Sequence, residues 1–333
     1  MSKHLKQFML SFTNRKQAGQ RALALRYRLE YLALRVWILL TGSFPIDANL
    51  STARLIGRAW WRLIKRHRER AMEHLRKALG DQYSEAELTH IARESFQHFT
   101  QLYLVELAQT PRLVHEWSWA NHVELGNMGP ALRELLSDRG VIMLTGHFGS
   151  YELLGYTIAR LGIPLYAVMR PLDNPLINEY LVASRQASGL NILYKKGAAE
   201  SAQSILEDKG TLCFIADQNA GHKGLFVDFF GQPASTYKSI GLLAIHHRVP
   251  IVVGAARRTS PRFEYDILAP RVIRPDEWEH LDDPLRYITQ EYTRAIELIV
   301  RDAPEQYLWI HRRWKSQPGQ RRKRRSAAAG ASG

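Results

Sequence analysis

From about residue 139 onward, short apolar runs alternate with longer segments of helical periodicity. Each run sits close to a glycine or proline and is too short for a helix, which is typical of a buried strand. Strands that alternate with helices predict an α/β fold with a largely parallel central sheet flanked by helices. Residues 263–267 alternate in polarity, which predicts a more exposed edge strand. The predicted strands are 141–145, 164–169, 191–194, 212–216 and 251–255, and the predicted helices are 153–161, 174–188, 198–208, 237–247 and 284–302.

The earlier part of the chain has helical patterns. Ser84 and Glu87 have the spacing of a capping box, which predicts a helix over about 84–108, and Pro111 is expected to end that region. Residues 51–79 predict a basic helix that carries a pair of tryptophans. We therefore expect four parts: a basic N-terminus with an interfacial or membrane-anchoring helix (1–45), a helical region (46–125), the α/β core (126–315) and a disordered basic tail (316–333).

Residues 20–44 predict a helix with chemically different faces. Arg21, Arg28 and Arg35 recur every seven residues and form one stripe, while leucine and valine side chains lie on other faces. The apolar run is shorter than the ~20 residues that span a bilayer, and a central arginine costs roughly 2.5–3.5 kcal/mol on insertion scales. The pattern favours a helix that lies in the membrane interface, which makes this a membrane-associating region. A spanning helix and an ordinary core helix are the alternatives.

Positive charge gathers at the two ends of the chain, whose net charge is +14. The segments before Glu30, from Arg54 to Lys77 and after Trp314 carry +7, +7 and +6, so the remainder carries −6. Basic ends of this kind suit either an anionic membrane surface or a nucleic acid. A nucleic-acid-binding protein is expected to have a basic middle as well, so the acidic middle argues against that class.

Cysteine usage and motif content exclude several kinds of site. The single cysteine, Cys213, rules out an internal disulfide framework, fits a reducing compartment and lies in an apolar run that predicts a buried position. The chain has no spacing typical of a zinc site, a Walker loop or a Rossmann glycine fingerprint. We therefore expect neither a metal ion nor a cofactor.

Polar residues follow three of the predicted strands. His147 and Glu152 come after the first, Arg170 after the second, and Asp217 with Gln218 after the strand at 212–216. Ligands of open α/β sheets gather at the carboxyl ends of strands, so these residues are the candidates for chemistry. Arg170 suits a phosphate or an oxyanion, or else a strand-end ion pair. Asp217 is expected to orient Arg170 or the acceptor, or simply to cap a turn.

His147 and Glu152 are five residues apart, so they cannot face each other on one continuous helix. They meet only if His147 lies in a turn, which Gly146 and Gly149 permit, and Glu152 lies in the first turn of the next helix. A carboxylate on one ring nitrogen would fix the tautomer and leave the other nitrogen as a general base. The alternative is a histidine and a glutamate that merely cap the helix.

The sequence around these residues resembles the His-x4-Asp/Glu motif of the lysophospholipid acyltransferase superfamily. It is most similar to the lipid A biosynthesis acyltransferases, the lauroyl and myristoyl transferases, over roughly residues 20–316. The segments that carry the resemblance are Thr145-Gly-His-Phe-Gly-Ser-Tyr-Glu152, Met169-Arg-Pro-Leu-Asp173, Lys196-Gly-Ala-Ala199, Ala216-Asp-Gln218, Phe229-Phe-Gly-Gln-Pro-Ala234 and Pro304-Glu-Gln-Tyr-Leu-Trp-Ile-His-Arg-Arg-Trp-Lys315.

The resemblance implies that His147 is the general base and Glu152 its partner. It also implies direct transfer of a fatty acyl chain from acyl carrier protein or acyl-coenzyme A to a hydroxyl of a membrane glycolipid, a lipid A precursor first of all. Because no nucleophile elbow is present, no acyl-enzyme is expected. The backbone amides from Phe148 to Ser150, including Gly149, and the Arg170 side chain are candidates for the oxyanion. The expected location is the cytoplasmic face of the inner membrane.

Other acceptors and other functions stay open at this point. A phosphatidylinositol mannoside, a lysophospholipid or an amino-acid lipid would suit the same chemistry. A non-catalytic lipid- or nucleic-acid-binding protein is the alternative of a different class.

Overall fold

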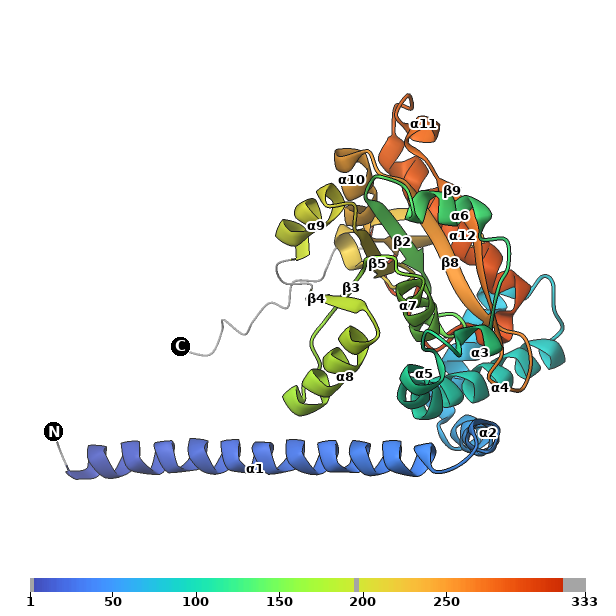
Figure 1. Cartoon of the computed structure of the whole chain (residues 1–333). Coiled ribbons are helices and arrows are strands. Elements are labelled where there is room, and N and C mark those ends of the chain that lie inside the picture. Colours follow the sequence, from blue (N-terminus) through green and yellow to red (C-terminus); the bar gives the residue numbers. More distant parts are fainter. Residues whose placement is uncertain (1–2, 195–197, 320–333) are drawn as a thin grey trace, which may run out of the picture.

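The computed structural model describes residues 3–194 and 198–319. The expected tail at 316–333 lies mostly outside these residues, as does part of the motif around Lys196. The centre is a seven-stranded sheet in the order β1-β9-β8-β2-β5-β3-β4 (Figure 1). Its strands are β1 (Val123–Leu125), β2 (Val141–Thr145), β3 (Leu165–Met169), β4 (Leu190–Tyr194), β5 (Thr211–Ile215), β8 (Ile251–Arg258) and β9 (Tyr265–Ile273). Strands β8, β2, β5, β3 and β4 are parallel, whereas β9 runs antiparallel to β8.

This sheet confirms the predicted α/β fold and corrects the expected edge. The five predicted parallel strands appear at their expected places. The segment after residue 263 is longer than expected and lies inside the sheet, since β9 pairs with both β8 and β1. The edge strand β1 is too short to leave a pattern in the sequence. A separate hairpin of β6 (Leu225–Phe229) and β7 (Gln232–Thr236) was also missed.

Helices cover both faces of the sheet. Successive residues of a strand point to opposite faces, so each strand contributes side chains to two cores. Ile142 and Leu144 belong to the core on one face, with side chains of α3, α4, α9, α10 and α12. Val141 and Met143 belong to the core on the other face, with side chains of α6 and α7. The helices of the α/β part are α6 (Gly129–Leu135), α7 (Tyr151–Arg160), α8 (Pro175–Ala187), α9 (Ala198–Glu207), α10 (Lys238–His247), α11 (Pro275–Trp278) and α12 (Pro284–Asp302).

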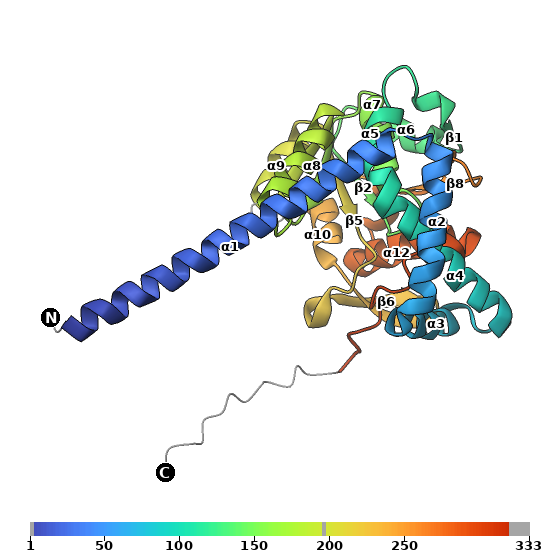
Figure 2. The same ribbon diagram turned by 90° about the horizontal axis from the view of Figure 1, so that it is seen from below.

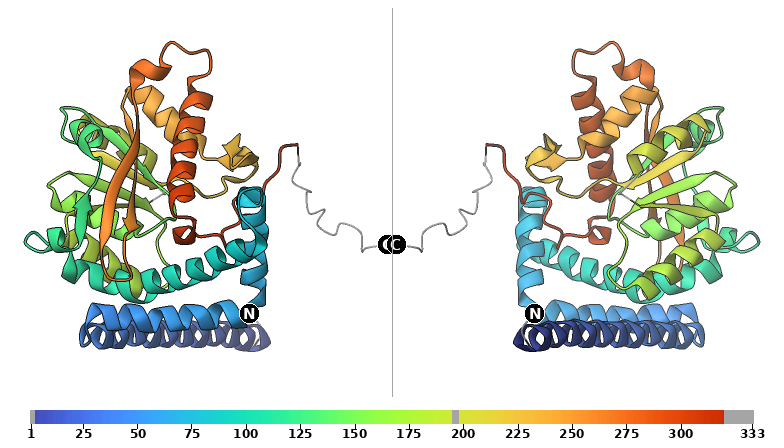
Figure 3. Two further views of the ribbon diagram at one scale, coloured as in Figure 1. Left: turned by 90° about the vertical axis from the view of Figure 1, so that its right-hand side faces the viewer. Right: turned by 90° about the vertical axis from the view of Figure 1, so that its left-hand side faces the viewer.

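The N-terminal helices form a base beneath the sheet. Figures 1, 2 and 3 show α1 and α2 lying in one layer, with the rest of the chain on one side of them. The predicted helix over 84–108 continues through a π-helical segment, so that Pro111 lies inside a helix instead of ending one. The basic helix is broken at Ile64 into two. The elements are α1 (Lys3–Gly42), α2 (Ile46–Leu63), α3 (Lys65–Leu79), α4 (Glu85–Gln101), the π-helix (Leu102–Glu106) and α5 (Leu107–Leu113).

Helix α1 packs by one face and exposes the other. On the packed side Asn174, the N-cap of α8, donates to Glu30. The Arg35 guanidinium lies over the Tyr180 ring, and the Trp37 indole donates to the Leu104 carbonyl. The outward faces of α1 and α2 carry exposed large aliphatic side chains, which we call the apolar base. Its members are Leu25, Leu29, Leu32, Val36, Leu39, Leu40, Leu55, Ile56 and Leu63. In the part of the chain that the structure describes, every helix is too short or too polar to cross a bilayer.

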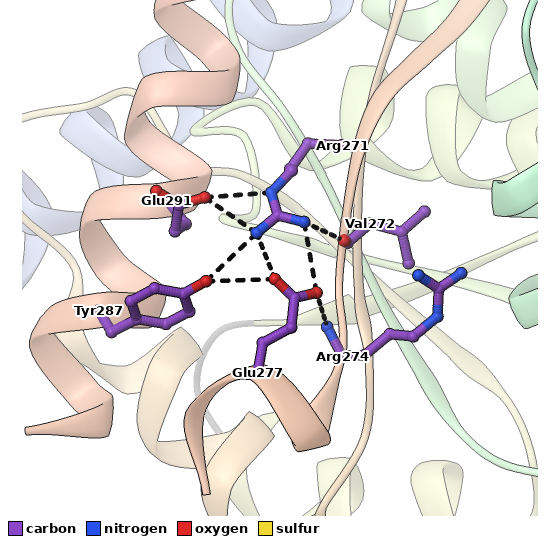
Figure 4. Close-up of polar contacts among 6 residues, drawn as sticks. All are labelled: Arg271, Val272, Arg274, Glu277, Tyr287 and Glu291. Atoms are coloured by element: carbon purple, nitrogen blue, oxygen red, sulfur yellow. Dashed lines mark hydrogen bonds and ion pairs between the residues drawn. The ribbon is translucent and has the colours of Figure 1, made fainter. Parts of the chain in front are cut away.

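A cluster of ion pairs fastens the far end of the sheet to its helices. The Arg271 guanidinium on β9 binds the carboxylates of Glu277 on α11 and Glu291 on α12 (Figure 4). The Glu277 carboxylate also accepts from the Tyr287 hydroxyl and from the Arg274 backbone amide. One guanidinium thus ties three elements together at the end of the molecule opposite the apolar base.

Candidate active site

His147 and Asp217 meet where two neighbouring strands end. His147 follows β2 and Asp217 follows β5, and these strands pair directly in the sheet. The His147 Nδ1 atom lies 2.7 Å from Asp217 Oδ1, and the His147 backbone amide donates to Oδ2 over 2.8 Å. The Asp217 side chain is 1% exposed and the imidazole 12%. Two bonds to one buried carboxylate therefore fix the position of the ring.

His147 and Asp217 each shift the pKa of the other. Burial acts to lower the pKa of His147, but the Asp217 charge and hydrogen bond outweigh it and raise that pKa above its usual 6.5. Burial acts to raise the pKa of Asp217, and His147 outweighs it and lowers that pKa. The carboxylate is therefore ionised at neutral pH. An ionised carboxylate on Nδ1 favours the tautomer whose unprotonated nitrogen is Nε2.

Glu152 lies in the first turn of α7, as expected, but its carboxylate has a different partner. Both of its oxygens bind the Arg185 guanidinium of α8, with Oε2 3.1 Å from Nε. The two side chains are 11% and 15% exposed, so the pair is largely buried. The expected contact between Glu152 and a ring nitrogen of His147 is thus corrected: the carboxylate on the imidazole is that of Asp217. Nothing in the sequence singled out Arg185, because it lies in an ordinary amphipathic helix.

The turn after β2 is tightly built. Gly149 has φ +54°, and a Cβ atom there would lie 1.8 Å from the Ala256 carbonyl oxygen. Burial lowers the pKa of His98 to about 3, so its neutral ring donates from Nε2 to the Gly149 carbonyl over 3.1 Å. The Gly149 amide donates to the Gln306 carbonyl, and the Ser150 amide donates to the Ala256 carbonyl, each over 3.0 Å. These two amides are already satisfied, which corrects the expectation that they face an oxyanion.

Gln218 reaches the site, whereas no hydrogen bond or ion pair links Arg170 to it in the described part of the chain. The Gln218 side-chain nitrogen is 3.3 Å from His147 Nε2, the nitrogen that faces away from Asp217. Arg170 follows β3 and is exposed. The expected contact between Asp217 and Arg170 is replaced by the contact between Asp217 and His147.

The C-terminal segment 307–314 packs beside the imidazole, a role that the sequence left unassigned. The His311 ring lies parallel to that of His147, with ring centroids 6.1 Å apart. Its Nε2 accepts from the Asn219 backbone amide, and burial lowers its pKa to about 4, so it is neutral near pH 7. Arg313, 2% exposed, donates to the Gln218 carbonyl, to the Ser235 carbonyl and to a threonine hydroxyl. This segment therefore fixes both the ring and the strand-end loop that carries Asp217.

Comparison with known proteins identifies the family. Residues 15–316 match the bacterial lipid A biosynthesis acyltransferases. The chain belongs to this family. It is 26% identical over 302 residues to the lipid A biosynthesis palmitoleoyltransferase of Escherichia coli, covering 88% of this chain and 93% of that protein. It is 25% identical, with the same coverage, to the lipid A biosynthesis lauroyltransferase of the same organism.

Membership of this family makes the chain an enzyme that transfers acyl groups. The lipid A acyltransferase match begins within α1 and ends just after the segment that packs on His147, so the rest of α1, all of α2, the sheet and the site fall inside it. Tyr151 completes the surroundings of the ring: its side chain meets the imidazole edge to face, with centroids 5.6 Å apart. Tyr151 stands inside the motif, yet its spacing alone gave no reason to expect this contact.

Proposed function

We propose that this acyltransferase moves a fatty acyl chain from a thioester to a hydroxyl of a lipid A precursor, with His147 as general base and Asp217 as the carboxylate that orients it. The observation that carries the proposal is the buried His147–Asp217 contact of 2.7 Å. The carboxylate holds the proton on Nδ1, and Nε2 is left to accept a proton from the acceptor hydroxyl.

The chemistry then follows in two steps. As Nε2 takes the hydroxyl proton, the alkoxide oxygen attacks the thioester carbonyl and forms a tetrahedral oxyanion. The C–S bond breaks as the carbonyl reforms, and the thiolate takes the proton back from the imidazolium. Gln218 is the proposed oxyanion donor, because its amide nitrogen lies 3.3 Å from the nitrogen at which the reaction occurs. No covalent acyl-enzyme enters this sequence.

Glu152 has a structural part in this proposal. By pairing with Arg185 it ties the first turn of α7 to α8, and α7 begins at Tyr151, which contacts the imidazole. Glu152 is therefore a positioning residue here. Arg170, exposed after β3, is the candidate for an anionic group of the acceptor or donor.

The acceptor and the donor come from the family and from the surface. Two relatives are named as lipid A biosynthesis enzymes that transfer palmitoleoyl and lauroyl chains, which supports a lipid A precursor as acceptor. Acyl carrier protein is the proposed donor, with acyl-coenzyme A as the alternative. The apolar base supports docking of the enzyme on a membrane surface, since monomeric soluble proteins rarely expose so many large aliphatic side chains together. The cytoplasmic face of the inner membrane is the proposed surface, in keeping with a lipid A precursor as acceptor.

The test compares His147→Ala with the exposed control His115→Ala in cells that lack their own copy of the enzyme. Mass spectrometry of membrane lipids should show an additional acyl chain on lipid A with the wild-type and control proteins and its loss with His147→Ala. An acyl chain that appears on another glycolipid or on a phospholipid would replace the acceptor and keep the chemistry. Wild-type levels of product from a folded His147→Ala protein would overturn the assignment of the base.

A further inference from the structure

A basic pocket lies between α2 and α4, outside the site described above. It has a volume of about 240 Å³. On α4 the pocket side is solvent-facing, because His90 and Arg93 are exposed whereas the neighbouring Ile91 and Ala92 are buried in the core. The pocket therefore opens away from the sheet. It is lined by Arg58, Trp61, Arg62, His90, Arg93 and Glu94.

The pocket keeps a positive charge that the protein does not neutralise. Its carboxylate, Glu94, is already engaged by Arg54, 3.4 Å away, and by the Gln97 side chain. In residues 3–194 and 198–319, the guanidinium groups of Arg62 and Arg93 have neither a hydrogen bond nor an ion pair, although their backbone carbonyls accept from Arg68 and Gln97. Three arginines thus face one engaged acid, which suits a small anion with several acceptor oxygens.

Close packing fixes the geometry of the pocket. At Gly57 the two helices approach so closely that an added Cβ would lie 2.6 Å from the Gln97 backbone. The Arg58 guanidinium, next to this contact, donates to the Gln97 side chain over 3.0 Å. Trp61 is 8% exposed and closes one wall. The walls are therefore set by helix packing, even though the arginine ends are exposed.

The pocket borders the apolar base. On α2 the core side is formed by Ala53, Gly57 and Trp61. At 100° per residue, Leu55 and Leu63 point away from this core side, and Arg58 and Arg62 lie between the core side and these two leucines. The Leu63 side chain is 77% exposed. An anion held by these arginines would lie at the level where an embedded aliphatic stripe ends, which is the depth of lipid headgroups.

We propose that this pocket binds the phosphate of an anionic phospholipid in the membrane on which α1 and α2 rest. The guanidinium groups of Arg62 and Arg93 bind the phosphate oxygens, and Trp61 contacts the headgroup from the side. The inference rests on the membrane-surface part of the proposed function and is independent of the acyl-transfer chemistry.

The experiment measures binding of the full chain to vesicles. Vesicles of phosphatidylcholine alone are compared with vesicles that contain phosphatidylglycerol, for the wild type and for Arg62→Gln/Arg93→Gln. The matched control is Arg133→Gln/Arg294→Gln, which removes the same charge from exposed positions on α6 and α12. Each basic residue near an anionic surface contributes about 1 kcal/mol, so the pocket variant should bind anionic vesicles about 25-fold more weakly. The control should change less than about threefold, and binding to neutral vesicles should be equal in all three.

The other outcomes each decide something. Equal weakening in pocket and control variants would show long-range attraction only and overturn the site. Unchanged vesicle binding with a lost affinity for acyl carrier protein would also overturn it and assign the pocket to the donor. Melting curves show whether both variants fold, and Arg62→Lys/Arg93→Lys should recover most of the binding. Transfer activity in detergent should be unchanged in the pocket variant, so a failure here is distinct from a failure of the His147 test.

Discussion

Replacing Asp217 by asparagine removes the negative charge that lies beside the imidazole and leaves the shape of the site nearly the same. Asp217 is buried and binds both the ring and the backbone of His147. In the transition state the ring becomes an imidazolium beside this carboxylate. With the charge centres about 4 Å apart and an effective dielectric constant of about 20, the carboxylate stabilises that charge by about 4 kcal/mol. At 1.36 kcal/mol per factor of ten, kcat should fall about 10³-fold.

The pH profile gives a second, independent readout. The Asp217 charge outweighs the effect of burial and raises the pKa of His147. The imidazole acts as a base only when it is neutral. Activity of the wild type should therefore fall as the pH drops through a value above 6.5. Asp217→Asn removes the raising influence, so the acid limb of kcat/KM should move to lower pH.

The assay follows transfer of a radiolabelled acyl chain from acyl carrier protein to a lipid A precursor in detergent. Melting curves show whether the variant folds. A folded Asp217→Asn enzyme with kcat within about tenfold of the wild type and an unmoved acid limb would refute the role given to this carboxylate.

Two further changes test neighbouring contacts. Glu152→Gln should lower the free energy of unfolding by about 3 kcal/mol in urea titrations, because Arg185 is left buried without its partner, and Glu152→Gln/Arg185→Met should recover most of that loss. A kcat loss of about 10³-fold with unchanged stability would instead place Glu152 in the proton transfer. Gly149→Ala should destabilise the fold by more than about 3 kcal/mol, because the new Cβ atom would clash with the Ala256 carbonyl and the alanine would have to adopt a left-handed backbone conformation. Gly162→Ala, with φ +83° and open space around it, should cost only about 1–2 kcal/mol, and similar losses at both positions in thermal unfolding would contradict this reasoning.

Local pattern was enough for the elements of the α/β part. The closing helix was predicted at 284–302 and is found at Pro284–Asp302, because its apolar side recurs with helical period over its whole length. Each buried strand is a short apolar run, since a strand covered on both faces has no polar side to show. The turn at His147 followed from its flanking glycines. In all these cases the information lies within a few residues of the element itself.

Strand β9 shows where such information ends. Its first residues alternate in polarity, which predicted an edge, yet β1 covers that edge with only Val123–Leu125. A strand this short has no period to detect, and its partner β9 lies far from it along the chain. Sheet order is a relation between distant segments, so it left no local mark.

The same reasoning explains the site. The sequence by itself placed His147 in the turn after a strand, Glu152 in the first turn of the helix that follows, and Asp217 at the end of another strand, since a recognisable apolar run precedes each of these places. Only the tertiary structure decided which carboxylate meets the imidazole, because the choice depends on β5 lying next to β2 and on Arg185 reaching Glu152 from another helix. Seventy residues separate His147 from Asp217 along the chain, and one strand spacing separates their strands in the sheet. Proximity in sequence therefore favoured the wrong partner, and hydrogen-bond geometry in the folded chain selected the other.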